Sequence, residues 1–380
     1  MDGSFFSIDD TDTRESGDGV TAEFRAEVSQ FLDEELTEDL ARAARETTGL
    51  KSPKWACKAW QAALARKGWV AQSWPAEFGG TGWTPAQQRY FDQACADRDA
   101  PVVHSSGIRT IGPLIMAMGS KDQQRHYLPA ILKGEHEWCQ GYSEPQAGSD
   151  LTALNMRAER DGDDFILNGS KLWTSFAHEA THMFLLARSE PRSTGKDGLV
   201  FLLIEMDRPG IEINPIRFID GECETNEVFF NNVRTPAANR IGEVGDGWGA
   251  ARALMTIARS NNTPPHLIRR ALRAAKRSTA SLTGDPGLAL RLAGLEMRLD
   301  AFDALCARKV SQADGPMDHL TASMLKVIAT ELQQAINETA VSGTDDQDLA
   351  RARYFANRAA TIYSGTSEVH RNTLARLIGC

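Results

Sequence analysis

The stretch FILNGSKLW, from Phe165 to Trp173, decides the fold class of this chain. It places an Asn-Gly pair between two apolar runs, and because both residues tolerate positive φ, the pattern predicts a β-hairpin turn at Asn168-Gly169. Further short apolar runs follow at Met183–Ala187, Leu199–Ile204, Ile211–Ile216 and Glu227–Phe230. Several short strands at such close spacing predict a small β-barrel or sandwich between residues 140 and 240.

Both flanks of this β region have the apolar periodicity of helices, as in the repeat of Val20, Phe24, Val28 and Leu32. Helices are expected at 20–38, 54–67, 85–98, 111–118 and 121–132 before the strands, and at 248–260, 267–283, 287–313, 319–341, 347–362 and 368–378 after them. We therefore predict a multidomain α+β protein. Its expected domains are an N-terminal all-α domain at 1–138, a middle β domain at 139–243 and a C-terminal four-helix-bundle domain at 244–380.

Composition narrows the classes of partner. The formal net charge of −9 leaves no excess of cations to displace counterions, so no nucleic-acid partner is expected. The six cysteines form no CxxC pair, which argues against a disulfide scaffold or zinc module and fits reduced thiols in a cytoplasmic protein. The acidic N-terminus lacks the features of a signal peptide. No apolar stretch approaches the ~20 residues of a membrane span, so no membrane association is expected.

Four segments carry the chemical information. They read QGYSEPQAGSD at 140–150, NGSKLWTS at 168–175, NEVFFNNVRTPAANRIGEVGDGWG at 226–249 and IYSGTSEVHRN at 362–372. In this order and spacing they resemble the acyl-CoA dehydrogenase family. WPAEFGGTGW at 74–83 and YLPAILKGEHEWC at 127–139 are similar to the helical N-terminal domain of that family. The resemblance therefore covers nearly the whole chain from about residue 20 onward.

The resemblance implies an FAD-dependent enzyme that oxidises the Cα–Cβ bond of an acyl-CoA thioester, giving a trans-2-enoyl-CoA. In such enzymes a carboxylate removes the α-proton while a hydride passes to the flavin, and an electron-transfer flavoprotein is the expected electron acceptor. The residues that match cofactor contacts of the family are Ser143, Ser149, Trp173, Ser175, Thr366 and Glu368. Arg259 matches an arginine that lines the acyl-CoA site.

The family pattern fails at the catalytic base. The usual glutamate follows the tyrosine of the last motif, where this chain has Ser364 after Tyr363. A minority of the family places the base directly before the arginine that matches Arg259, where this chain has Ala258. A serine of ordinary pKa cannot remove a thioester α-proton without a partner base. The sequence therefore assigns no catalytic base.

Two further elements are missing, and both normally serve the FAD of a neighbouring subunit. The segment KRSTASLTGDPGLALR lacks the Arg-x-x-Phe-Gly stretch, and the loop within AVSGTDDQDL is shortened. This pattern resembles subunits of the α2β2 bacterial enzymes that shorten steroid side chains, in which two different chains share flavin and catalytic elements. A paralogous sister subunit in a heterotetramer is therefore expected, with a homo-oligomer as the alternative.

Other interpretations stay open. The chain could be a non-catalytic subunit that completes the FAD site of its partner, or a flavin oxidase or oxygenase on the same fold. Singly, Trp173 also suits a core position on a strand, and Arg259 also suits a solvated helix face. His178 and His182 have the i, i+4 spacing of metal ligands, but no third ligand is evident and no metal site is expected.

Overall fold

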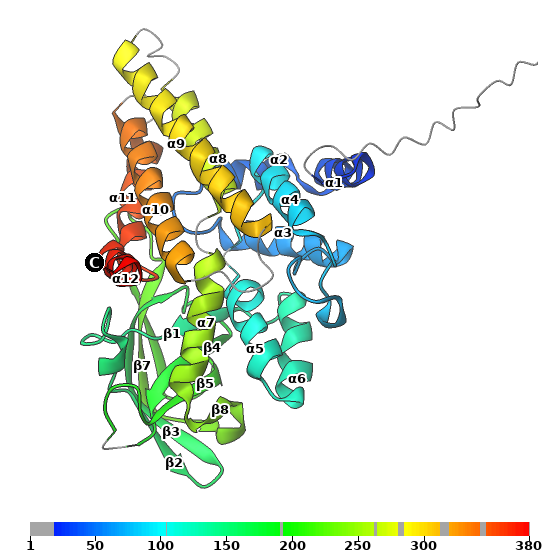
Figure 1. Cartoon of the computed structure of the whole chain (residues 1–380). Coiled ribbons are helices and arrows are strands. Elements are labelled where there is room, and N and C mark those ends of the chain that lie inside the picture. The colour runs from blue at the N-terminus through cyan, green and yellow to red at the C-terminus, as the bar shows by residue number, and fades with distance from the viewer. Residues whose placement is uncertain are drawn as a thin grey trace, which may run out of the picture.

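The computed structural model describes residues 19–103, 105–190, 193–261, 264–279, 285–311, 319–342 and 347–379, with the backbone alone at 258–261, 309–311, 319, 347 and 378. Within these residues the chain runs from a helical region through a sheet to a second helical region (Figure 1). The predicted order of helices, β domain and helices is confirmed.

The N-terminal region is a cluster of helices around an aromatic core. Its helices are α1 (Ala22–Glu35), α2 (Glu38–Glu46), α3 (Lys54–Lys67), α4 (Pro85–Asp97), a π-helical turn (Gly107–Ile111), α5 (Gly112–Met118) and α6 (Lys121–Leu132). Hydroxyl side chains cap several of them, and the caps of α4 and α6 are complete capping boxes. Phe31, Trp60, Trp69 and Phe91 are buried and lie ring against ring, which fixes α1, α3 and α4 around one centre.

The middle region is a single mixed sheet. Its strands are β1 (Trp138–Gly141), β2 (Arg157–Asp161), β3 (Asp164–Ser175), β4 (His182–Arg188), β5 (Leu199–Glu205), β6 (Ile211–Ile216), β7 (Thr225–Pro236) and β8 (Arg240–Gly245). The strands lie in the order β6-β7-β3-β2-β4-β5-β8, and β1 pairs with β4 in parallel. The longest ladder joins β3 to β7, and it carries Trp173 and Ser175 at its far end.

The hairpin predicted at Asn168-Gly169 is wrong. Both residues lie inside the continuous strand β3, and the tight turn between β2 and β3 is at Gly162-Asp163 instead. The register with β7 shifts between Leu167 and Gly169, so the pair forms a β-bulge, and Gly169 takes φ 139°. The backbone of Met156 approaches Gly169 so closely that a Cβ there would lie 3.0 Å from its Cα. The glycine serves a close approach between strands rather than a turn.

The two halves of the sheet curl around a shared apolar core. On β4 and β5, alternate residues such as Met183 and Val200 pack inward with residues of β3 and β7. The intervening residues, such as Phe184 and Phe201, face the opposite way and pack against α5, α6 and α7 (Gly247–Asn261). Both faces of these two strands are therefore buried, which explains why their sequences are apolar between the strand ends.

The C-terminal region is a helical bundle that rises from the sheet. Its helices after α7 are α8 (Pro265–Ser278), α9 (Pro286–Ser311), α10 (His319–Val341), α11 (Gln347–Asn357), a 3-10 turn (Arg358–Thr361) and α12 (Ser367–Ile378). Its core is built from α8, α9 and α10 through residues such as Leu272, Leu299 and Leu332. Helix α7 lies along β5 and ties the bundle to the sheet.

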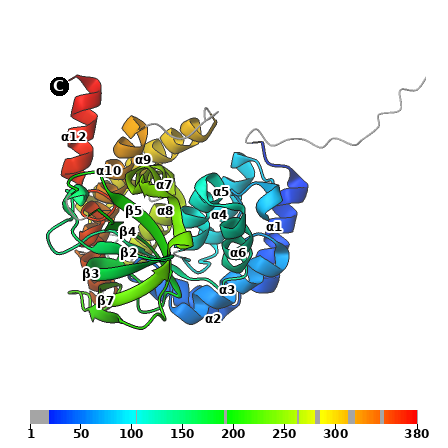
Figure 2. The same cartoon turned by 90° about the horizontal axis from the view of Figure 1, so that it is seen from below.

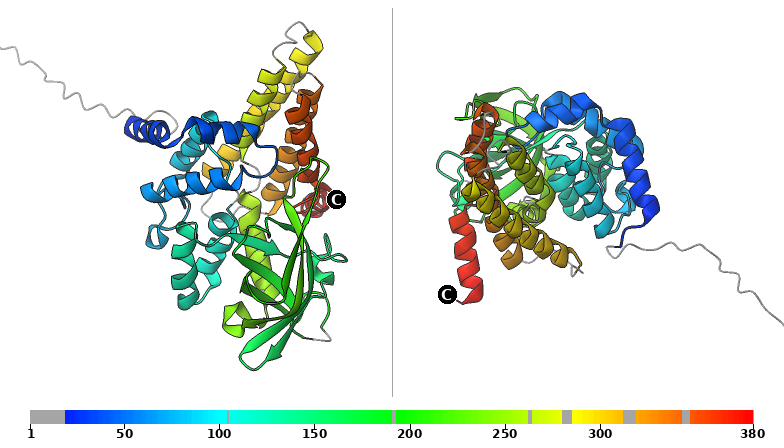
Figure 3. Two further views of the ribbon diagram at one scale, coloured as in Figure 1. Left: turned by 180° about the vertical axis from the view of Figure 1, so that it is seen from behind. Right: turned by 90° about the horizontal axis from the view of Figure 1, so that it is seen from above.

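The three regions meet around the middle of the molecule. Views from below and from above place the N-terminal helices on one side of the sheet and the bundle, while α12 projects outward from the opposite side (Figures 2 and 3). Arg353 of α11 donates to the Thr47 carbonyl, so the bundle also reaches the connection between α2 and α3. Of the described helices, none has the length and apolar character to cross a membrane.

Candidate functional site

The end of strand β3 presents an aromatic face to solvent. Trp173 is 55% exposed, and its backbone has φ 63°, in the left-handed region that non-glycine residues rarely occupy. The ladder with β7 is irregular between Lys171 and Thr174, which is where the strand turns the indole outward. Strained backbones of this kind cluster at active sites and ligand-binding sites. The Phe218 ring flanks it, with 6.4 Å between centroids.

Ser143 and Ser175 lie next to this indole. The backbone N–H of Leu172 donates to the Ser143 carbonyl at 2.8 Å, so the segment after β1 runs beside Trp173. Ser175 is the last residue of β3 and pairs with Thr225 of β7. The fold thus brings Ser143, Trp173 and Ser175 together. Ser149 lies on the exposed bend that follows the same segment.

A buried ion pair, which the sequence did not reveal, holds the Ser143 segment in place. Lys171 Nζ lies 2.8 Å from Glu144 Oε1 and also donates to the Tyr142 carbonyl, and both charged side chains are almost fully buried. Glu144 accepts further bonds from the backbone N–H groups of Asn155 and Met156. Burial lowers the pKa of Lys171, while the charge of Glu144 and its hydrogen bond act the other way. With its partners satisfied, this pair fixes the loop rigidly.

The turn from Tyr363 to Thr366 is the second element of the candidate site, after the end of strand β3. Ser364 and Gly365 both have left-handed backbones, with φ 56° and 91°. Lys326 of α10 donates to the Gly365 carbonyl at 2.8 Å, and His370 Nε2 lies 3.2 Å from the Ser364 carbonyl. Burial lowers the pKa of Lys326 to about 8, against the charge of Glu368. The strained turn is therefore held from two helices.

Thr366 and Glu368 occupy the start of α12. The Thr366 Oγ1 accepts from the Val369 N–H at 3.1 Å and caps the helix. Glu368 is exposed in the first helical turn, and hydrogen bonds to the backbone and to Thr366 lower its pKa. Both groups face solvent near the turn, which leaves them accessible to a bound molecule.

Glu224, which the sequence analysis missed, lies beside the end of β3, and its Oε1 accepts from the Leu50 N–H at 2.6 Å. It directly precedes Thr225, and its carbonyl accepts from the Phe176 N–H at 2.8 Å, just past Ser175. Burial and, secondarily, the charge of Glu224 raise the pKa of the Tyr363 hydroxyl to about 12. A lone glutamate in a loop gives no sequence signal of its own.

Arg259 and Ala258 lie in the last turn of α7, but their side chains are outside the described part of the structure. The expected acyl-CoA contact of Arg259 therefore stays a prediction. His178 accepts or donates a bond with Asn226, and His182 with Thr181, at 2.9 and 2.8 Å. Among the described residues, no three His, Cys, Asp or Glu side chains gather as metal ligands would.

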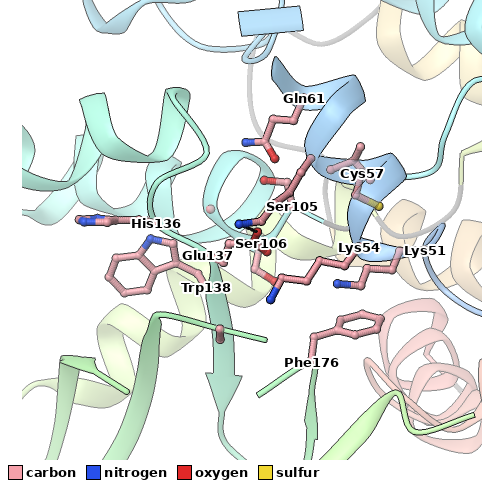
Figure 4. A pocket seen from close by; sticks show the side chains of 14 residues that line it. Lys51, Lys54, Cys57, Gln61, Ser105, Ser106, His136, Glu137, Trp138 and Phe176 are labelled. Atoms are coloured by element: carbon pink, nitrogen blue, oxygen red, sulfur yellow. Dashed lines mark ion pairs between the residues drawn. The ribbon is translucent and has the colours of Figure 1, made fainter. Parts of the chain in front are cut away.

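A cavity lies between α3, residues 103 and 105–107 and the start of β1, and Phe176, just past the end of β3, also lines it (Figure 4). Lys51, Lys54 and Lys58 line it, and the Lys51 ammonium lies 2.7 Å from Glu179 and 4.1 Å from the Phe176 ring centroid. Burial raises the pKa of the Cys57 thiol to about 11, so this cysteine is not a thiolate nucleophile at neutral pH. The cavity abuts the site without adding a reactive group.

A flavin fits these residues. The exposed Trp173 offers a flat surface for a ring system, and hydroxyl and backbone groups of Ser143 and Ser175 stand beside it for the polar ring edge. The loop at Ser149 and the start of α12 supply backbone N–H and hydroxyl groups suited to phosphate oxygens. When bound, FAD supplies the hydride acceptor.

Comparisons with known proteins agree with this geometry. Three consecutive segments match the acyl-CoA dehydrogenase N-terminal domain at residues 21–135, middle domain at 139–233 and C-terminal domain at 245–379. The chain is 36% identical over 379 residues to acyl-CoA dehydrogenase IpdE1 of Mycobacterium tuberculosis, covering 94% of this chain and 97% of that protein.

Two solved structures are similar in fold as well. One is the Tcur3481-Tcur3483 steroid ACAD, with a TM-score of 0.82 and 26% identity, covering 97% of this chain and 99% of that chain. The other is the ChsE4-ChsE5 complex from Mycobacterium tuberculosis, with a TM-score of 0.80 and 28% identity, covering 94% and 97%. These matches span almost the whole chain, so FAD is its cofactor and the protein belongs to the acyl-CoA dehydrogenase family.

Proposed function

We propose that this chain is one subunit of a hetero-oligomeric acyl-CoA dehydrogenase that forms a trans-2-enoyl-CoA from a bulky acyl-CoA of steroid type. The observation that carries the proposal is its similarity to IpdE1 and to two structures whose names describe a steroid ACAD and a two-protein complex. An electron-transfer flavoprotein is the proposed electron acceptor. The domain boundaries proposed from the sequence, at 138/139 and 243/244, fit this assignment.

The chain's own residues would act on the cofactor as follows. Trp173 and Ser175 would face the flavin ring system, and Ser143 would hydrogen-bond its polar edge. Ser149, Thr366 and Glu368 would contact the dinucleotide, and Arg259 the acyl-CoA. The absence of a carboxylate at Ser364 and Ala258 supports a protein that relies on another group as base.

Exposed apolar side chains support a partner subunit. Leu377, on the projecting helix α12, is 55% exposed, and Ile362, in the turn that precedes this helix, is 64% exposed. Apolar side chains displayed on a projecting helix are typical of a surface that another chain covers. A sister subunit would bury them while completing the flavin site.

The test is co-expression with a paralogous acyl-CoA dehydrogenase subunit encoded beside this chain. We expect a yellow complex with FAD that a steroid acyl-CoA bleaches under anaerobic conditions, giving an enoyl-CoA detected by mass spectrometry. Oxygen consumption in place of enoyl-CoA would indicate the oxidase or oxygenase. A purified complex without flavin would contradict the proposal.

Substitution separates an active from a non-catalytic subunit. Trp173→Ala should lower FAD content and flavin reduction in the complex, because it removes the surface for the ring. Trp55→Ala is the matched control, since Trp55 on α3 is equally exposed at 55% and lies outside the site. If Trp173→Ala behaves like Trp55→Ala in both measurements, the surface around Trp173 serves no catalytic site, and the role of this chain in the complex is structural.

A further inference from the structure

The cavity beside α3 carries more positive charge than the carboxylates around it balance. Lys54 and Lys58 lie one turn apart on α3, and Lys51 lies just before this helix. Lys51 and Lys54 pair with Glu179, at 2.7 and 4.0 Å, and Lys58 pairs with Glu137 at 3.7 Å. Three ammonium groups therefore share two carboxylates, and one positive charge is left over.

These lysines differ in how firmly the protein holds them. The Lys51 ammonium donates to Glu179 and lies over the Phe176 ring, and its side chain is only 10% exposed. Lys54 and Lys58 are 45% and 57% exposed, and their carboxylate partners are too distant for a hydrogen bond. In the part of the chain that the structure describes, neither ammonium donates a hydrogen bond. Lys54 and Lys58 therefore keep their donors available for a bound molecule.

Two neutral side chains add donors to the same cavity. Ser106 and Gln61 both line it, and the Ser106 hydroxyl does not cap the π-helical turn that follows. Among the described residues, neither side chain has a hydrogen-bond partner. Figure 4 shows the Gln61 and Lys54 side chains leaving α3 toward the segment that carries Ser106. The lining is thus rich in donors, which suits a ligand group rich in oxygen.

The cavity is small and adjoins the candidate flavin site. Its volume is about 30 Å³, whereas a benzene ring needs a cavity of about 150 Å³, so it admits one small polar group and no ring system. Phe176, which lines it, directly follows Ser175 at the end of β3. The cavity therefore lies next to the strand end where we propose that flavin and substrate bind.

The unbalanced charge selects among small groups that contain oxygen. A ketone or a hydroxyl group would leave the extra ammonium charge uncompensated. A phosphate monoester carries a charge of about −1.5 to −2 near neutral pH, which exceeds the single charge that is left over. A carboxylate carries one negative charge and has two oxygens that accept from ammonium and hydroxyl groups. Size and charge together favour a carboxylate.

We infer that this cavity is a subsite for a carboxylate on the acyl group, so that the substrate is the mono-CoA thioester of a bulky dicarboxylic acid. This inference rests on the proposed function and names the substrate class of that same site. Lys54 and Lys58 bind the carboxylate oxygens, and Ser106 and Gln61 donate to the same group. Because this group is not the one that reacts, the subsite acts on KM more than on kcat.

The experiment compares two thioesters on the complex with its sister subunit. Both have a cyclohexane ring with propanoic acid arms on opposite carbons, and one arm is the CoA thioester. The other arm is a free carboxylate in one compound and its methyl ester in the second. Both contain the phosphates of CoA, so the ratio of their kcat/KM values isolates the carboxylate. The wild type should prefer the free carboxylate by about 10- to 100-fold.

Variants of α3 test which groups cause this preference. Lys54→Met combined with Lys58→Met should abolish it, by lowering kcat/KM for the carboxylate while the ester stays near its wild-type value. Lys67→Met is the matched control, because Lys67 lies on the same helix, is 41% exposed and pairs with Glu27 away from the cavity. It should keep the wild-type preference. Arginine at positions 54 and 58 should retain most of the preference.

The outcomes separate this inference from the proposed function. Equal kcat/KM values for the two thioesters in the wild type overturn the subsite, leave the dehydrogenase standing and require no variant to fold. A preference that survives in the double variant also overturns it. So does an equal loss with both thioesters, which would place the two lysines on the phosphates of CoA.

The remaining outcomes are decided by binding. If the two thioesters bind without turnover, their inhibition constants against a steroid acyl-CoA are compared instead, with the same expected ratios. If neither compound inhibits, the dicarboxylic class is wrong and the inference is overturned. A complex that contains no flavin and is reduced by no acyl-CoA overturns the proposed function, and the inference with it.

Discussion

The ion pair of Lys171 and Glu144 shows how one pair of residues can hold a segment of the candidate site, here the segment that carries Ser143, in place. Both charges are buried, and the other partners of Glu144 are the backbone N–H groups of Asn155 and Met156 and the side-chain amide of Gln146. A buried pair adds little compared with apolar residues, but removal of one partner leaves an uncompensated charge. The position of Ser143 beside Trp173 therefore depends on this pair remaining intact.

We expect Lys171→Met to lower the free energy of unfolding by about 3–5 kcal/mol, because it leaves the buried Glu144 carboxylate without a cation to balance its charge. Urea denaturation measures the loss. Arg125→Ala is the control, since it removes an exposed pair with Asp122, and it should cost less than about 1 kcal/mol. Equal losses in the two variants would contradict the stated role of burial.

Gly365 is required in the last turn for two separate reasons. Its φ is 91°, and a Cβ there would lie 2.7 Å from His370 Nε2. Gly365→Ala should therefore lower the free energy of unfolding by more than the ~1–2 kcal/mol of left-handed strain alone. Gly379→Ala supplies that reference, because Gly379 has φ 82° with open space around it. If Gly365→Ala lowers the melting temperature no more than Gly379→Ala does, the His370 side chain moves away from the added methyl group without loss of stability.

At the level of helices and strands, local pattern predicted much of the chain. The bounds predicted for α3, α6, β6 and α10 are those of the structure, because apolar spacing and end signals agree there. The helix predicted at 20–38 is wrong at its end, since Thr37 caps a separate helix, α2. The hairpin at Asn168-Gly169 failed because the pair meets Met156 and Asn232 across the sheet, and those contacts are not local in sequence.

Thr366 has a structural role at the start of α12 besides its proposed contact with FAD. Thr366→Ala should lower the free energy of unfolding by about 1 kcal/mol through loss of the cap, and Thr366→Ser should retain most of it. Thr373→Ala is the control on the same helix, because its hydroxyl only bonds back to the Val369 carbonyl. If the two alanine variants unfold alike in urea, Thr366 is not an effective cap.

At the scale of the whole molecule, the free energy of unfolding should depend on pH through two groups. Their contributions change with pH in opposite directions. Burial lowers the pKa of His182 to about 4 from its ordinary 6.5, so His182 contributes stability above pH 6.5 that is lost as the pH falls toward 4. Burial raises the pKa of Glu224 to about 7 from its ordinary 4.5, so its contribution is present below pH 4.5 and is lost as the pH rises through 7.

The free energy of unfolding, measured in urea from pH 4 to 8, should reveal both effects in variants. His182→Phe should abolish the rise with pH between 4 and 6.5. Glu224→Gln should abolish the fall with pH between 4.5 and 7, an effect on the order of 3 kcal/mol or less. A Glu224→Gln profile parallel to the wild type would mean that this carboxyl titrates normally.

The sequence by itself determined the order of helices and strands and the family. Those properties follow from spacing between near neighbours and from short motifs. Only the tertiary structure decided that Glu224 meets Leu50, that Trp173 is turned outward and that Lys171 is buried against Glu144. The physical reason is that burial and electrostatic environment depend on contacts between residues far apart in the chain, and local periodicity carries no record of them.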